Sequence, residues 1–233
     1  MCPLYKSAIF MEEIKINKII RSRRKTIALV ITRDATLVVR APLRASLGYI
    51  NGLVSKKSHW IRKKLLEMSE RPMPPVKEFV NGEEFFYLGK PYQLCIVENS
   101  DSDIELKDKL YLSKRAVPEA REVLKLWYKS EALKIISDRC KRYQRIIGCK
   151  PSSIKISEAK KRWGSCGRKG TLNFSWRLIM APVEVIDYLI VHELAHIGQL
   201  DHSRAYWSKV GSILPDYKIW DKWLKDNDGL LMF

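Results

Sequence analysis

Three of the four histidines in this 233-residue chain lie within a short segment that can bind a metal ion. His192, Glu193 and His196 form the pattern His-Glu-x-x-His, and His202 follows six residues after the second histidine. Residues four apart lie on the same face of an α-helix, so His192 and His196 can direct both imidazoles at one ion. Glu193 adjoins that face and can reach a water molecule bound to the metal.

A third ligand follows the expected helix. Gly198 allows the chain to turn out of the helix, so that His202 can return towards the ion. Catalytic zinc usually has three protein ligands and an open position, whereas structural zinc is usually closed by four ligands. The spacing therefore predicts one zinc ion on His192, His196 and His202, with Glu193 acting on its bound water. A solvated helix face is the alternative, but the flanking residues are apolar: Leu189, Ile190, Val191, Leu194 and Ile197.

Helices and strands that position this segment are recognisable from their patterns. Pro182 opens the helix expected to run to about residue 197, and a last helix is expected to begin near Ser203. Upstream, strands are expected at 153–158 and 171–175, with a turn at 167–170 between them. A long helix is expected at 118–147, which holds no Gly and no Pro beyond Pro118, and Gly148 is its natural end.

The first half of the chain is mostly strand-like. Residues 26–32 and 36–40 are expected to form a hairpin, and residues 46–68 have the apolar period of a helix. Further short strands are expected at four places: 84–88, 91–97, 104–107 and 109–112. The sequence therefore predicts an α+β protein, with a strand-rich N-terminal region of one helix at 1–112 and a catalytic region at 113–233.

The motifs of this chain resemble those of the YgjP-like metallopeptidases, relatives of the SprT-like zincins. In the second half the matching residues are Arg162–Cys166, Asn173, Leu178–Pro182, Asp187-Tyr188, His192–His196, His202-Ser203 and Tyr206-Trp207. The first half matches at Arg40–Pro42, Trp60-Ile61, Tyr87–Lys90 and Tyr92, so the resemblance runs from about residue 12. It implies a zincin-like C-terminal domain with a small antiparallel sheet, zinc on the three histidines, and Glu193 as catalytic acid and base. Tyr206 stands where phenylalanine is expected.

Several residues are candidates for contact with the substrate. Zincins often bind an extended substrate along a strand before the active-site helix, so the strand at 171–175 is expected to pair with a peptide, with Asn173 at the rim. Arg162, Tyr188 and Tyr206 are candidates for stabilising an oxyanion, although each also fits a structural role.

Two neighbours of these candidates are less suited to chemistry. Ser165 has no dedicated base, because the nearby histidines are better used as ligands. Cys166 fits a buried packing position better than a metal-binding or redox role.

Cysteine usage and apolar runs indicate the compartment. The five cysteines are odd in number and include no Cys-x-x-Cys pair, which argues against a secreted disulfide scaffold and fits a reducing cytosol. The N-terminus lacks the apolar stretch of a signal peptide, and no run reaches the length of a membrane helix. A cytoplasmic protein without membrane contact is expected.

Charge widens the choice of partners. The formal net charge of +17 favours polyanions, and three basic clusters, at 15–25, 56–64 and 139–150, lie mainly in the N-terminal half and on the long helix. A peptide or protein substrate is the first expectation. The alternatives are a nucleoside triphosphate or other phosphoanhydride, cleaved by the same metal-dependent chemistry, and a nucleic-acid-associated binding module with a structural metal.

Overall fold

The computed structural model of the chain describes residues 14–32, 34–70, 76–98, 100–159, 162–227, 229 and 231. Contacts divide it into two compact units, Met1–Pro74 and Pro75–Phe233. Within the described residues, no helix combines the length and apolar character needed to cross a membrane.

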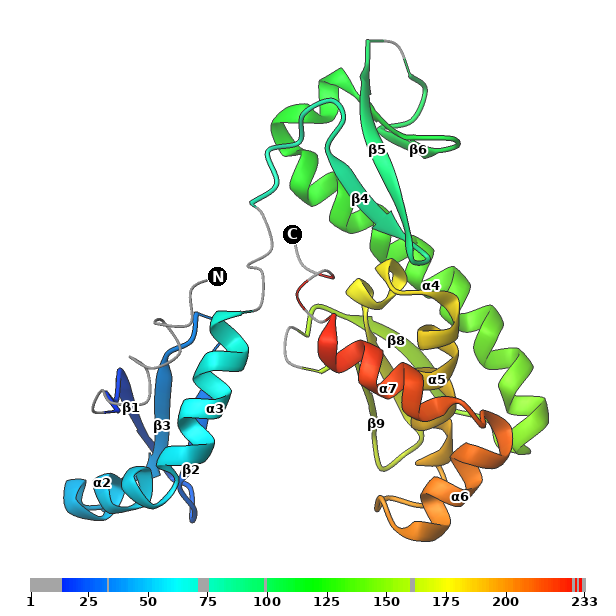
Figure 1. The fold of residues 1–233 in the computed structure, drawn as a ribbon. Coiled ribbons are helices and arrows are strands. Elements are labelled where there is room, and N and C mark those ends of the chain that lie inside the picture. Colours follow the sequence, from blue (N-terminus) through cyan, green and yellow to red (C-terminus); the bar gives the residue numbers. More distant parts are fainter. Residues whose placement is uncertain are drawn as a thin grey trace. The chain divides into compact units, whose positions relative to one another are not determined.

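The N-terminal unit is a small sheet covered by two helices (Figure 1). Strand β3 (Leu37–Pro42) lies between β1 (Lys18–Ser22), to which it is parallel, and β2 (Ala28–Ile31), to which it is antiparallel. The predicted hairpin is therefore confirmed as β2 and β3. The single helix expected at 46–68 is two helices, α2 (Leu47–Lys56) and α3 (Ser58–Ser69).

A four-stranded sheet begins the second unit. Its strands are β4 (Glu84–Tyr87), β5 (Lys90–Val97), β6 (Ile104–Leu106) and β7 (Leu110–Ser113), in the order β4-β5-β7-β6. Phe85, Leu94 and Leu110 of this sheet are buried in the same core as the helices that follow. The boundary predicted at 112/113 consequently lies inside this unit, because the sheet has no separate core.

A long helix joins this sheet to the C-terminal elements. After a short 3-10 helix, η1 (Lys114–Glu119), helix α4 (Ala120–Ile147) runs for 28 residues and ends at Gly148 in the left-handed conformation. The long helix predicted from the sequence is thus confirmed. Tyr128 in its first third donates its hydroxyl to the backbone oxygen of Phe86 at 2.7 Å, which fastens β4 to the helix.

A second sheet lies before the motif helix. Its strands are β8 (Ser153–Ser157), β9 (Gly164–Cys166) and β10 (Thr171–Ser175), in the order β8-β10-β9. Strand β10 is antiparallel to β9 but parallel to β8, so the sheet is mixed, and the expectation of an antiparallel sheet was wrong. The chain returns through β9 before it forms β10, which gives β8 and β10 the same direction.

Helix α5 (Val183–Ala195) carries the histidine motif and is buried along most of its length (Figure 1). It follows η2 (Trp176–Met180) and is succeeded by α6 (Arg204–Ile213) and α7 (Tyr217–Asp226). The helix predicted near Ser203 is confirmed as α6. Nε and Nη2 of Arg139 on α4 both donate to the carboxylate of Asp187 on α5. This bidentate ion pair joins α4 and α5 in addition to their packing.

The tip of the β4–β5 hairpin supports the start of α5. The backbone N–H of Leu88 donates to Ile179 at 2.8 Å, and that of Gly89 donates to Met180 at 3.2 Å. Gly89 has a φ of +80°, and a Cβ there would lie 2.9 Å from Cα of Pro182. Glycine is therefore required at this position by both conformation and space.

Candidate active site

Three imidazole nitrogens converge at the end of α5. Nε2 of His202 lies 3.2 Å from Nε2 of His196 and 3.3 Å from Nε2 of His192. Zinc binds imidazole at about 2.0–2.1 Å, so nitrogens on two corners of a tetrahedron lie about 3.3 Å apart. The observed separations fit one tetrahedral ion. Without a cation, three lone pairs directed at one point would repel each other.

The surroundings of His196 and His192 suit metal binding in different ways. Nδ1 of His196 lies 2.9 Å from the backbone oxygen of Gln199, so it carries the proton and leaves Nε2 for a ligand. Burial, with smaller effects of the two neighbouring imidazoles, lowers the pKa of His192 to about 4. His192 is therefore neutral near pH 7, which metal binding requires. His202 is exposed, so the cluster opens to solvent on its side.

Glu193 is buried beside this cluster, with 4% of its surface exposed. Burial raises the pKa of its carboxyl to about 7, and the charge of Arg162 opposes that shift. A carboxyl with a pKa near the working pH suits a group that both accepts and returns a proton.

Space for this carboxylate comes from Gly164 on β9. A Cβ at this position would lie 2.5 Å from Oε1 of Glu193 and 2.9 Å from its Cδ. The Trp-Gly-Ser-Cys motif thus owes its glycine to close packing against the glutamate, not to an unusual backbone conformation.

Comparisons with known proteins identify the family of this chain. The family model described as YgjP-like, metallopeptidase domain, matches residues 25–227. The chain belongs to the YgjP-like family. Membership makes it a metal-dependent hydrolase. A solved structure, the metallopeptidase zymogen of Pyrococcus abyssi abylysin, is similar at 23% identity over 39% of this chain and 92% of that one, with a TM-score of 0.36. The search of curated proteins found no match.

Other residues of the YgjP-like motifs have structural positions. Tyr206 is fully buried, and its hydroxyl donates to the backbone oxygen of His192 at 2.9 Å while its ring stacks on His196. Tyr188 donates its hydroxyl to Asp221 at 3.1 Å. Both tyrosines therefore hold the segment that carries the histidine cluster, and both hydroxyls are engaged within the protein.

The two remaining substrate candidates differ in their surroundings. Asn173 lies on β10, where its neighbours are Ser165 of β9 on one side and Lys155 of β8 on the other. Because both sides of β10 are occupied, the expectation that a peptide pairs with this strand was wrong. Arg162 is exposed and acts electrostatically on Glu193, so it lies near the cluster and is accessible.

Cys166 is half-buried, and its thiol contacts the backbone oxygen of Gly167 at 3.6 Å. Burial raises the pKa of this thiol, with a further contribution from the charge of Glu193. Both effects disfavour a thiolate ligand. The structure is consistent with the packing role expected for this cysteine.

Gln199 was not singled out from the sequence, yet it organises the loop between α5 and α6. Its backbone oxygen contacts His196, and its side-chain amide donates to the hydroxyl of Ser203 at 2.5 Å. Ser203 in turn caps α6 by accepting from the N–H of Tyr206. The only signal in the sequence is its position between Gly198 and His202.

We predict that Gly164→Ala reduces turnover strongly while the metal content stays near that of the wild type. The three atoms nearest to the added methyl group all belong to the Glu193 side chain, so the substitution displaces this carboxylate first. Misplacement of a catalytic group by about 1 Å can cost on the order of 100-fold in rate. Activity and metal content of the purified variant should be compared with those of Gly211→Ala, whose nearest contact is a tyrosine ring at 3.4 Å. Full activity in Gly164→Ala would contradict the packing argument.

Proposed function

We propose that this YgjP-like protein is a zinc-dependent peptidase with one zinc ion on His192, His196 and His202 and with Glu193 as its acid–base residue. The observation that carries the proposal is the convergence of three Nε2 atoms beside a buried carboxyl. Three ligands and an exposed His202 leave a position for substrate, which a closed structural zinc site would lack.

Zinc would supply a Lewis acid that polarises the scissile carbonyl and makes water a better nucleophile. Glu193 would accept the proton of the attacking water through its carboxylate and then deliver it to the leaving amine. Tyr206 would keep His192 and His196 in place through its hydrogen bond and its ring. Arg162 would stabilise negative charge on the carbonyl oxygen, since it is accessible and near Glu193.

An extended peptide would bind along β9. This strand pairs only with β10 among the described residues, so its other edge offers unpaired backbone groups. Gly164, at the start of β9, packs directly against Glu193. A peptide added to this edge would therefore run past the acid–base residue.

Substrate class can be tested with the purified, zinc-loaded protein. We expect cleavage of an unfolded protein, loss of cleavage after treatment with a chelator, and recovery when zinc is restored, because the proposed reaction requires the bound zinc ion. In a parallel assay with nucleoside triphosphates, the wild-type protein should release no more phosphate than the Glu193→Gln variant does. Hydrolysis of the triphosphates without any peptide cleavage would contradict the proposal and favour phosphoanhydride substrates.

A further inference from the structure

A positively charged pocket adjoins the histidine cluster on the side of His196. Its volume is about 580 Å³, and its lining includes His196 together with Lys150, Arg168 and Lys169. No aspartate or glutamate lines it. A proposed metal ligand, His196, therefore lines this pocket, and no negatively charged side chain in the lining neutralises the cations.

Two of the cations come from the tight turn between β9 and β10. The turn is held by N–H donations from Gly167 to Thr171 and from Gly170 to Gly167, each at 2.8 Å, and Gly170 has a φ of +75°. Arg168 and Lys169 at its tip are exposed, and neither forms an ion pair with any described residue. A rigid turn thus presents two unneutralised charges.

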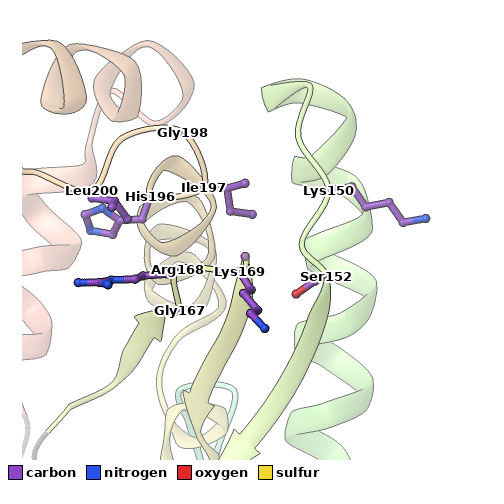
Figure 2. A pocket seen from close by; sticks show the side chains of 10 residues that line it. Lys150, Ser152, Gly167, Arg168, Lys169, His196, Ile197, Gly198 and Leu200 are labelled. Atoms are coloured by element: carbon purple, nitrogen blue, oxygen red, sulfur yellow. The ribbon is translucent and has the colours of Figure 1, made fainter.

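Side-chain directions distinguish the three cations. In Figure 2, Arg168 extends to the same side of the turn as the His196 imidazole, whereas Lys169 lies on the other side, beside Ser152. Lys150 points away from the pocket in the same view. Arg168 is therefore the cation on the side of the histidine cluster, and Lys169 adds positive charge on the other side of the turn.

The nearest acid of the adjoining loop is already engaged. Asp201 accepts hydrogen bonds from the backbone N–H of Ser203 at 3.2 Å and from the side-chain amide of Gln199 at 3.3 Å. It is not among the residues that line the pocket. Its carboxylate contributes to the loop and leaves Arg168 and Lys169 for an external anion.

We propose that Arg168, with Lys169 adding to the local positive charge, forms an anion subsite that binds an aspartate or glutamate side chain of the substrate near the scissile bond. This inference rests on the proposed peptidase function. Arg168 lies two residues beyond the end of β9 at Cys166, in the turn that follows this strand. A peptide on the edge of β9 would therefore bring a side chain a few residues from the scissile bond to the Arg168 side of this turn.

The test uses zinc-loaded protein and peptide hydroxamates, whose hydroxamate group binds the metal and fixes the register of the peptide. Two series, with the hydroxamate at the C-terminal or the N-terminal end, cover both sides of the scissile bond. In each series a single glutamate is compared with glutamine at successive positions. We expect glutamate to bind about fivefold tighter at one or two adjacent positions of one series, as one exposed charge pair with a second cation nearby allows.

Substitutions at the turn separate a subsite from general attraction to a basic protein. The double substitution Arg168→Ala with Lys169→Ala should abolish the preference for glutamate, and Arg168→Glu with Lys169→Glu should reverse it in favour of lysine. Lys134→Ala, which removes an exposed lysine of α4 outside the pocket lining, should retain the preference. An equal preference for glutamate at every position, or a preference that survives the double alanine substitution, would overturn the subsite.

Failure of the proposed function gives a different result. Zinc-loaded protein that binds none of the hydroxamates overturns the proposed metal centre, and the subsite falls with it. Tight binding of hydroxamates without any dependence on glutamate overturns the subsite alone. Cleavage sites in an unfolded protein provide a second readout, because they should be enriched in aspartate or glutamate at the position found in the scan.

Discussion

Replacement of Glu193 by glutamine is expected to reduce peptide cleavage by about 10²- to 10⁴-fold, the usual contribution of a positioned acid–base group. Glutamine has nearly the same shape, so it fits the space beside Gly164 that the glycine leaves open. It cannot accept the proton of the attacking water. The three histidines are untouched, so the protein should retain its metal.

The measurement pairs the cleavage rate with metal content on the same preparation. Glu184→Gln is a matched control, because Glu184 is an exposed residue of the first turn of the same helix. It should retain both rate and metal. Glu193→Gln that cleaves at the wild-type rate would exclude Glu193 as the acid–base residue.

Replacement of His196 by alanine is expected to release the metal and abolish activity. This residue contributes Nε2 to the cluster, so its loss leaves only two of the three proposed ligands. The loss of a direct ligand should weaken metal binding by more than the about 10- to 100-fold that follows loss of an outer-shell partner.

Thermal unfolding gives a second measurement of the same substitution. Zinc at about 100 times its Kd should stabilise the wild type by about 2.7 kcal/mol, and this gain should vanish in His196→Ala. His59→Ala is the control, since His59 is an exposed residue of α3 in the other unit. Unchanged zinc content in His196→Ala would refute the assignment of this ligand.

Local patterns in the sequence predicted much of this structure. The spacing of His192 and His196 reflects one helical turn, and Gly148 marks the end of α4 because its backbone is left-handed. Only a short loop separates His202 from His196, so its imidazole can reach the other two. These features depend on residues close together in the chain, which is why periodicity and spacing indicate them.

Features that depend on distant residues were not predictable in the same way. The mixed pairing of β10 is set by β8 and β9 together, and a single sequence does not reveal which strand occupies the edge. Neither a glycine nor a proline stands at Lys57, so the apolar period runs through the break between α2 and α3. Strand β1 is not evident from the sequence, because its lysine and arginine residues are also typical of a basic surface cluster.

The role of Tyr206 illustrates the same limit at the site. Its sequence position after His202 is compatible with contact to a substrate, and only the fold shows that its hydroxyl reaches back to the backbone of α5. The placement of residues 75–112 in the N-terminal region also depended on local pattern alone. Strand content alone does not reveal whether Phe85 and Leu94 share a core with α4.

The tip of the β4–β5 hairpin links the stability of helix α5 to a segment far away in sequence. Its two backbone hydrogen bonds and the close approach of Gly89 to Pro182 join residues about ninety positions apart. Regions linked in this way tend to open together as one cooperative unit in the native state. Insertions and deletions at this hairpin tip are consequently expected to destabilise the histidine cluster, although the tip contributes no side chain to it.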